Sequence, residues 1–383
     1  MKDTPQYQGF ELGPIRPPSE AGSLLLRVTR NCPWNFCKFC TLYKGKKFSK
    51  RPVFHIKQDI DLLKKHINRI KSVPFSGDFR SINLMPIVES TPKEELPVFQ
   101  AALHWYRGKM VSVFLQDANS LIIPPDDLVE ILTYLREAFP DIQRITSYAR
   151  SHTIARISDV DMARLSAAGL NRIHVGMESA ADDVLKLVKK GVDKATHIKA
   201  GQKVKQAGIE LSEYYMPGLG GAELSTSHAI ESADALNQIN PDFIRLRTLA
   251  VIDFSELAKD ARAGIFTPVG DLEIARELLL FLEHLDGIQS AVKSDHILNL
   301  FQEVDGVLPD EKDKLIAPVK KFLSMDLETQ MIFRVGRRAG IFSSLDDLKN
   351  FGLMAYAEEA RDRYGITVDN IDHFTEELIK RYI

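Results

Sequence analysis

The sequence predicts an α/β protein, a partial (β/α)6 TIM-like barrel followed by a helical C-terminal region that caps it. Two observations lead to this prediction. Between residues 23 and 255, short β-prone runs alternate with longer stretches of helical apolar periodicity, and beyond about residue 270 only the helical periodicity continues. Strands separated by helices of this length imply right-handed crossovers and a parallel sheet. We therefore expect an extended lead-in at residues 1–22, the barrel at 23–255 and the helical region at 256–383.

The individual elements follow from local patterns. A β-prone run at 24–29 predicts the first strand, and apolar residues that recur at intervals of four and three from Ile56 to Ile70 predict a helix. Residues 72–110, with a helix at about 94–107, are treated as an insertion. Further strands are expected at 111–116, 142–148, 172–178, 209–216 and 243–249, with helices at 127–138, 158–168, 181–207 and 225–236. Helices are expected in the tail at 272–285, 290–303, 310–323 and 326–338.

Charge and hydropathy narrow the class of protein. The formal net charge of -2 gives no global positive field, which disfavours nucleic acid as a partner. No leader pattern opens the chain and no apolar run approaches the roughly 20 residues that span a bilayer, so we expect a cytoplasmic protein without a membrane partner. The densest basic cluster, at residues 44–51, is either a solvated loop or a holder of an anionic substrate or reductant.

The cysteines are the most informative residues. The chain has only three, Cys32, Cys37 and Cys40, and they fall within nine consecutive positions. Three thiols this close cannot pair completely as disulfides, so they indicate a metal site in a reducing compartment. Thiolates suit iron-sulfur clusters and zinc. A structural zinc ion normally takes four protein ligands, and a histidine such as His55 would have to supply the fourth.

Further candidate residues lie where predicted strands end. In parallel sheets the chemistry sits at the carboxyl ends of the strands. Gln116 and Asp117 end one strand, Arg150 follows the next, and Glu178 ends the one after that. The glycine-rich turn at 216–221 follows a further strand, where glycine lets backbone approach a ligand closely.

Together these motifs resemble the radical S-adenosylmethionine (SAM) superfamily. The resemblance covers roughly residues 22–250 and is strongest to the branch with the oxygen-independent coproporphyrinogen oxidases and the Elongator-type catalytic subunits. It is carried by the three cysteines, by the aromatic Phe39 before the last of them, by the His174-Val175-Gly176-Met177-Glu178-Ser179 strand end and by the glycine-rich turn. The cysteine spacing departs from the family, with four residues and then two between the thiols where most members have three and then two.

The resemblance implies cofactors and site residues. One 4Fe-4S cluster would be held by the three cysteines, and S-adenosyl-L-methionine would chelate its remaining iron. Reductive cleavage of SAM would give a 5'-deoxyadenosyl radical that abstracts hydrogen from a small molecule. A low-potential electron donor such as flavodoxin or ferredoxin is the expected partner. The residues expected to contact the cofactor are Phe39, Gln116, Asp117, Arg150, Glu178, Met216 and Gly218. The alternative for Glu178 is a charge that stabilises the helix after it.

The substrate side is placed in the tail. Asp295 and His296 offer an acid and an imidazole on a segment expected to close the barrel mouth, and they are the predicted catalytic residues. The alternative is that Asp295 caps a helix that begins near His296. Two other functions stay open, namely radical modification of tRNA or protein, and a non-catalytic metal-binding regulator.

Overall fold

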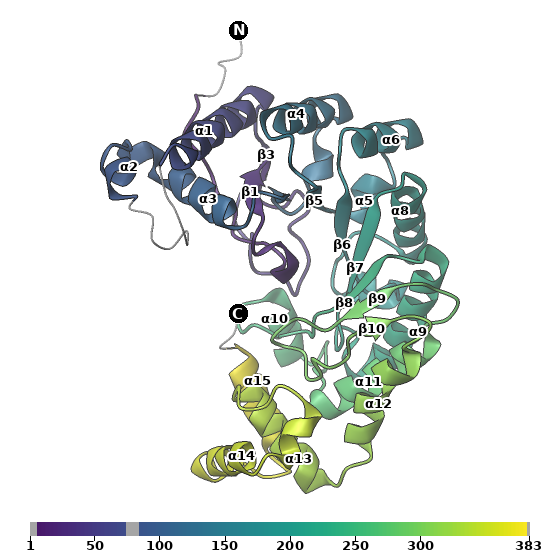
Figure 1. Cartoon of the computed structure of the whole chain (residues 1–383). Coiled ribbons are helices and arrows are strands. Elements are labelled where there is room, and N and C mark those ends of the chain that lie inside the picture. The colour runs from purple at the N-terminus through teal and green to yellow at the C-terminus, as the bar shows by residue number, and fades with distance from the viewer. Residues whose placement is uncertain (1–5, 74–83, 381–383) are drawn as a thin grey trace. The chain divides into compact units, whose positions relative to one another are not determined.

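A computed structural model describes residues 6–73 and 84–380 (Figure 1). Contacts divide the chain into two compact units, each described by itself below. The first comprises Met1–Pro33, Leu42–His174 and Lys203–Glu210, and the second comprises Trp34–Thr41, Val175–Gln202 and Leu211–Ile383. The predicted boundaries at residues 22 and 255 stay predictions. Residues 74–83 of the predicted insertion lie outside the described residues.

The first unit is built on parallel strands in the order β1-β4-β5-β6. β1 pairs with β4 from Leu24 opposite Val113 onward, and β4 pairs with β5 from Ser112 opposite Arg144. Every residue of β4 is buried, as expected for a parallel strand covered on both faces. The strands span Leu24–Arg27 (β1), Ser112–Gln116 (β4), Arg144–Ala149 (β5) and Arg172–Glu178 (β6, whose second half belongs to the second unit).

Helices cover these strands. The predicted stripe from Ile56 to Ile70 is buried on α1, which packs against α3, α4 and β1 (Figure 1). Two short antiparallel strands, β2 and β3, flank the loop of residues 31–48, which contains the cysteines. These elements are β2 (Thr29–Arg30), β3 (Ser49–Lys50), α1 (Val53–Lys71), α2 (Met85–Glu89), α3 (Leu96–Arg107), α4 (Pro125–Ala138), α5 (Ser151–Ile154) and α6 (Asp159–Ala167).

The second unit continues from the end of β6 in the order β6-β7-β8-β9-β10. β7 and β8 pair in parallel, as do β8 and β9, while β10 is antiparallel to β9. The remaining elements are β7 (Glu210–Tyr215), β8 (Phe243–Leu246), β9 (Ala291–Lys293), β10 (Gly306–Val307), α7 (Asp182–Leu187), α8 (Lys194–Gln206), α9 (Gly221–Ile239), α10 (Glu256–Arg262), α11 (Asp271–His284), α12 (Lys312–Leu323), α13 (Leu327–Arg338), α14 (Phe351–Arg363) and α15 (Ile371–Lys380). The end of α8 and the first residue of β7 belong to the first unit.

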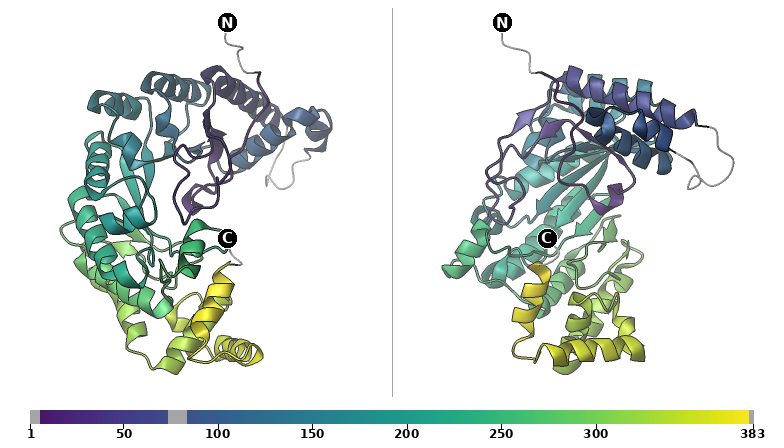
Figure 2. Two further views of the ribbon diagram at one scale, coloured as in Figure 1. Left: turned by 180° about the vertical axis from the view of Figure 1, so that it is seen from behind. Right: turned by 90° about the vertical axis from the view of Figure 1, so that its left-hand side faces the viewer.

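The core of this unit lies between its strands and helices α9, α11 and α12. Tyr215 stacks on Phe281 with ring centroids 3.9 Å apart. The later helices, green-yellow to yellow in Figure 2, form a group in which α13 packs against α14 and α15. Asp271 attaches this group of helices to α11, because Arg334 and Arg338 of α13 both donate to its buried carboxylate. Burial opposes ionisation of Asp271, but the two guanidinium groups lower its pKa.

The α/β class, the parallel strands and the helical C-terminal region are confirmed, and one predicted helix is wrong. Residues 290–303 form β9 and a loop, so the sheet has strands beyond the predicted six. Val292, Leu298, Leu300 and Phe301 are buried there by packing of a strand and a loop, whereas Ile297 is 52% exposed. Within the described residues, no helix has the length and apolar character needed to cross a bilayer.

Candidate active site

The three cysteines lie on the loop between β2 and β3. Cys32 belongs to the first unit, and Cys37 and Cys40 belong to the second. All three are free thiols and all are partly exposed. In residues 6–73 and 84–380, no three side chains of the metal-binding types converge as a preformed site, so the fit of a metal group rests on the donor chemistry of the loop. Three accessible thiols on one short loop suit an iron-sulfur cluster.

In the first unit, Asp117 holds this loop at a residue before the cysteines and at a residue after them. Its Oδ2 accepts a hydrogen bond from the backbone N–H of Asn31 at 2.9 Å, directly before Cys32, and its Oδ1 accepts from the Tyr43 hydroxyl at 2.6 Å. Arg27 also donates to Oδ2, at 2.8 Å from Nη2 and 3.1 Å from Nε. Asp117 is fully buried. Burial and the bond to Asp117 raise the pKa of Tyr43, so this hydroxyl stays a donor.

Gln116 is engaged by the N-terminal segment. Its Oε1 accepts from the N–H of Gly13 at 2.8 Å, and its Nε2 donates to the carbonyl of Ile15 at 2.8 Å. Arg150 lies directly before α5, where its backbone N–H donates to Asn119 Oδ1 at 3.1 Å. The predicted cofactor contacts of Gln116, Asp117 and Arg150 stay predictions. The hydrogen bonds give Asp117 and Gln116 a second role, which is to fix neighbouring segments of the first unit.

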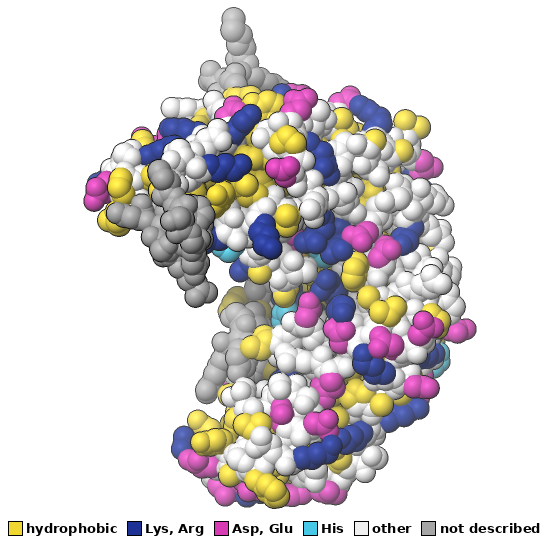
Figure 3. Space-filling model, in the orientation of Figure 1, with side chains coloured by type: hydrophobic (Ala, Val, Ile, Leu, Met, Phe, Trp, Pro, Cys, Tyr) yellow, Lys and Arg dark blue, Asp and Glu magenta, His cyan; other side chains and the backbone are white. Residues whose placement is uncertain are grey.

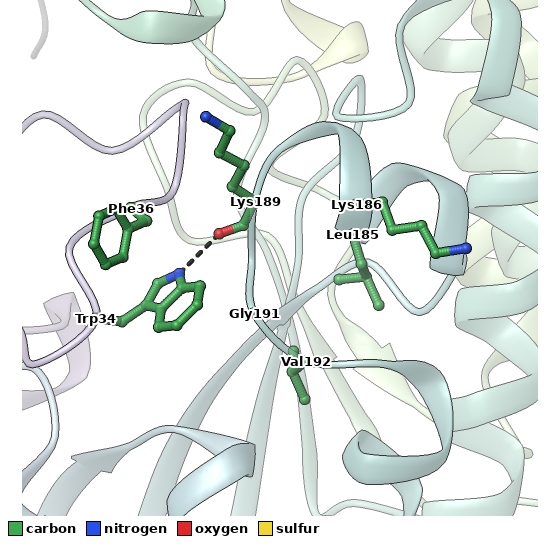
Figure 4. Close-up of a pocket in the computed structure, with 7 residues that line it drawn as sticks. All are labelled: Trp34, Phe36, Leu185, Lys186, Lys189, Gly191 and Val192. Carbon is green, nitrogen blue, oxygen red and sulfur yellow. Dashed lines mark hydrogen bonds between the residues drawn. The ribbon is translucent and has the colours of Figure 1, made fainter.

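In the second unit, backbone and aromatic contacts hold the middle of the loop. The indole N–H of Trp34 donates to the Lys189 carbonyl at 2.8 Å, and Phe36 lies edge-on to the indole (Figure 4). The N–H of Lys38 donates to the Val188 carbonyl at 2.9 Å. The two aromatic residues line a pocket of about 420 Å³ whose other side is formed by Leu185, Lys186, Lys189, Gly191 and Val192.

Phe39 and Glu178 lie on the same side of this unit, and a lysine joins them. Phe39 packs against an apolar cluster that includes Val188 and Met216. Lys190 forms an ion pair with Glu178 and has its ammonium 5.9 Å from the centre of the Phe39 ring. Glu178 has φ +64°, a conformation that non-glycine residues adopt only where the surroundings enforce it. Sequence reasoning missed Lys190, and only its position twelve residues after Glu178 could have suggested it.

The glycine-rich turn after β7 is held from α11. Gly218 has φ +88°, and its N–H donates to Glu277 Oε1 at 2.7 Å. The same carboxylate accepts from Tyr215 and Ser225. The Met216 carbonyl faces Nε2 of the buried His228 at 3.0 Å. Burial lowers the pKa of His228, so the imidazole is neutral at pH 7. Glu277 and His228 were missed because they lie on helices, away from any strand end.

Asp295 and His296 lie on the loop that replaces the predicted helix. Asp295 therefore caps no helix there, and the capping interpretation is wrong. Its Oδ2 instead accepts from Arg245 of β8 at 2.6 Å. Burial, together with the charge of the nearby Arg247, lowers the pKa of His296 to about 4. The structure thus brings both predicted residues to the end of β8, while their catalytic role stays a prediction.

Comparison with known proteins places this arrangement in context. A family model described as the radical SAM superfamily matches residues 26–226. Two curated relatives match shorter segments. The tRNA uridine(34) acetyltransferase of Methanocaldococcus infernus is 27% identical over 117 residues, which is 30% of this chain and 22% of that protein. Its counterpart from Methanocaldococcus jannaschii is 26% identical over 106 residues, which is 27% of this chain and 20% of that protein. The chain therefore spans about a fifth of the length of these relatives.

Solved structures are similar at low identity. The archaeal Elp3 of Methanocaldococcus infernus, with its N-terminus deleted, aligns at a TM-score of 0.40 and 16% identity, covering 56% of this chain and 55% of that one. Coproporphyrinogen III oxidase (HemN) from Escherichia coli aligns at a TM-score of 0.44 and 16% identity, covering 69% of this chain and 52% of that one.

Proposed function

The chain belongs to the radical SAM superfamily, and we propose that it cleaves S-adenosylmethionine reductively at one 4Fe-4S cluster and abstracts hydrogen from a small molecule. The family match makes the chain an enzyme of this class, and the family implies both a 4Fe-4S cluster and SAM. The observation that carries the proposal is the set of three free, partly exposed thiols within nine residues of the matched segment.

The cluster would be held by Cys32, Cys37 and Cys40. When bound, it would supply one electron to the sulfonium of SAM, and the cleavage would give methionine and a 5'-deoxyadenosyl radical. The residues of the chain fix the loop at both sides. Asp117 holds Asn31 and Tyr43, and the carbonyls of Val188 and Lys189 hold Lys38 and Trp34. An electron carrier of low potential, such as flavodoxin or ferredoxin, would supply the electron.

The second unit offers groups that match the polar parts of SAM. The Lys190 ammonium would bind the methionine carboxylate, and Glu178 would accept from ribose hydroxyls or from the amine. The Phe39 ring would pack against the cofactor, and the backbone of Met216 and Gly218 would lie beside the adenine. The ion pair between Lys190 and Glu178 holds both groups in place before the cofactor arrives.

A second candidate function is modification of tRNA. The two tRNA uridine(34) acetyltransferases favour it, although each match covers less than a third of this chain. The formal net charge of -2 favours a small molecule over a nucleic acid as the substrate. On the face drawn in Figure 3, basic and acidic side chains are intermixed and form no continuous basic stripe.

The test is anaerobic reconstitution followed by reduction. We expect about four irons per chain, as one 4Fe-4S cluster requires, and formation of 5'-deoxyadenosine from SAM with dithionite. Cys37→Ala should remove the cluster and lower product formation by more than a hundredfold, because a cluster ligand is lost. Stoichiometric zinc without iron-sulfur absorbance, or equal product from the variant by chromatography, would contradict the proposal.

A further inference from the structure

The loop after β9 is fastened to the end of β8 by a buried asparagine. Asn299 Oδ1 accepts from the N–H of Thr248 at 2.9 Å and from its hydroxyl at 3.1 Å. The Nδ2 group of Asn299 donates to the carbonyl of Leu246 at 2.8 Å. Asn299 is 3% exposed, so solvent does not compete for these bonds. The side chains at 295 and 296 are therefore held beside those of β8.

Most charges at this end of the sheet are compensated. Arg245 pairs with Asp295 at 2.6 Å and also donates from Nε to the Ser212 hydroxyl at 3.2 Å. Lys293 pairs with Asp305 at 2.7 Å. Each of these two ion pairs carries no net charge.

Arg247 differs from its neighbours. Its side chain is exposed, and within the described part of the chain it has no ion-pair partner. Its backbone N–H donates to the Tyr215 carbonyl at 3.0 Å, and the N–H of Leu249 donates to the Pro217 carbonyl at 2.9 Å. The segment that carries Arg247 therefore runs directly alongside the turn that leads to Gly218.

His296 complements this cation. It is close enough for the charge of Arg247 to lower its pKa, and with a pKa of about 4 it is neutral at pH 7. A neutral imidazole keeps one N–H donor, so it binds an anion without adding charge. A guanidinium group binds carboxylate or phosphate through two parallel hydrogen bonds.

We propose that Arg247 and His296 form a subsite for the anionic group, carboxylate or phosphate, of a small-molecule substrate. This inference rests on the proposed function and names the substrate class for it. One uncompensated cation matches one anionic group, whereas a nucleic acid backbone requires several cations along a stripe. Asp295 acts here as a positioning residue, since it neutralises Arg245 and leaves Arg247 as the group that faces an anion.

The test measures binding of simple anions to the reconstituted full-length protein. Glutarate is the carboxylate probe, glutaramide is its neutral counterpart, and inorganic phosphate is the second anion, each followed by ligand-observed NMR. We expect Arg247→Gln to weaken glutarate binding about tenfold, because the charge and the two parallel donors of the guanidinium fork are lost. Arg247→Lys should weaken it less, since it keeps the charge and loses only the fork. Arg276→Gln is the matched control, because Arg276 is an exposed arginine on α11 with its own partner, Glu273.

The outcomes separate clearly. Glutarate binding that depends on Arg247, with no binding of glutaramide, supports a carboxylate. A stronger dependence for phosphate supports a phosphoryl group at the same subsite. Equal binding by the wild-type protein and Arg247→Gln overturns the inference. So does binding of a short RNA oligonucleotide that requires Arg247 while the small anions do not. If the wild-type protein forms no 5'-deoxyadenosine from SAM, the proposed function fails, but the anion measurement is unaffected by that result.

Discussion

The two sides of the cysteine loop are fastened by different kinds of interaction. In the first unit, one buried carboxylate, Asp117, accepts hydrogen bonds from Asn31, Tyr43 and Arg27. In the second unit, the loop is held by backbone carbonyls, by aromatic packing and by the ion pair of Lys38 with Asp260 at 2.5 Å, and Trp34 donates to the Lys189 carbonyl. The first attachment concentrates its stabilisation in a single buried charged side chain. The second spreads it over several contacts, of which only the partly exposed pair of Lys38 with Asp260 is charged.

This difference predicts different responses to mutation. Removing one partner of a buried charged network leaves other charges without compensation, which costs about 3–5 kcal/mol. Loss of one neutral hydrogen bond costs about 1 kcal/mol. A single substitution at Asp117 should therefore strongly destabilise the attachment in the first unit. Single substitutions in the second unit should each destabilise the attachment there only slightly.

The largest effect is expected for Asp117→Asn. The substitution removes the charge that Arg27 contacts at 2.8 Å and leaves it the more distant Glu11, at 3.6 Å, as counterion. It also turns an amide N–H toward other donors, so we expect the free energy of unfolding to fall by about 3 kcal/mol. Iron per chain after reconstitution should fall with it, because Asn31 next to Cys32 loses its anchor. Urea unfolding of the apoprotein and iron analysis measure the two effects.

A matched control uses another carboxylate that accepts from a tyrosine. Asp61 is exposed and accepts from the Tyr134 hydroxyl at 2.7 Å, so Asp61→Asn should change both quantities little. Tyr43→Phe should lower the free energy of unfolding by about 1 kcal/mol, since one hydrogen bond is lost. If Asp117→Asn behaves like Asp61→Asn, the concentrated attachment described here does not exist.

Much of the fold follows from sequence because apolar period and burial agree. The stripe from Ile56 to Ile70 is buried on one helix, and the run at 172–178 is a strand with the predicted bounds. The exception at 290–303 has a physical cause. Side chains from one distant helix, α13, hold that loop, since Arg337 donates to the carbonyls of Asn299 and Leu300, and Arg338 donates to that of Leu298. A local pattern contains no information about such partners.

The candidate site was predictable only in part, for a similar reason. The three cysteines stand out because their chemistry and spacing are local properties of the chain. Lys190, Glu277 and His228 do not, since each gains its role from a partner far away in sequence or on another element. Glu277, for example, reaches Gly218 across 59 positions. Asp117 was selected for its place at a strand end, but its three donors came only from the structure.

The second side of the loop is tested by Gly191→Ala. Gly191 has φ +71°, and a Cβ there would lie 2.2 Å from the Trp34 ring, so the indole must move away from Lys189. Gly208 is a matched control with φ +69° and open space around the position of a Cβ. We expect about 1 kcal/mol of destabilisation for Gly208→Ala from backbone strain alone. Gly191→Ala should cost about 1 kcal/mol more, with a shift in tryptophan emission. Equal values for the two variants would mean that Trp34 contributes nothing.

Glu178→Gln sharpens the comparison within the second unit. It keeps the shape of the side chain and removes the charge that pairs with Lys190, so the affinity for SAM should fall about tenfold while the iron content is retained. Calorimetry under anaerobic conditions measures the affinity. Glu231→Gln is the control, because Glu231 pairs with Lys194 at 2.5 Å on the partly exposed face of α9. An unchanged affinity for SAM would support the alternative interpretation, in which Glu178 only stabilises the helix after it.

The smallest effect, at pH 5, is expected for a second buried carboxylate, which contrasts with Asp117. Glu213 of β7 is 1% exposed, and neither of its carboxylate oxygens has a hydrogen-bond partner with ordinary geometry in residues 6–73 and 84–380. Burial, with a further contribution from Glu178, raises its pKa well above the usual value, against the opposing effects of Lys190 and the Met177 N–H. Glu213 is therefore protonated in the folded protein at pH values where an unfolded chain, with a pKa of about 4.3, has lost the proton.

The sign of the pH dependence follows from this difference in bound protons. Above about pH 4.3 the folded state retains a proton that the unfolded state releases, so rising pH lowers the stability until the folded pKa is reached. Glutamine is neutral in both states and carries no such dependence. Glu213→Gln should therefore raise Tm relative to the wild-type protein by about 2 °C at pH 5, which corresponds to on the order of 1 kcal/mol. The rise should be larger at pH 7–8, because the difference grows by about 1.4 kcal/mol per pH unit below the folded pKa. Thermal unfolding of both proteins across this range measures the difference. Glu210→Gln, at an exposed position of the same strand, should show no such growth with pH. A difference in Tm between Glu213→Gln and the wild-type protein that stays constant from pH 5 to 8 would mean that the carboxyl is ionised in the folded protein. Glu213 would then have to be stabilised by charged partners, as Asp117 is.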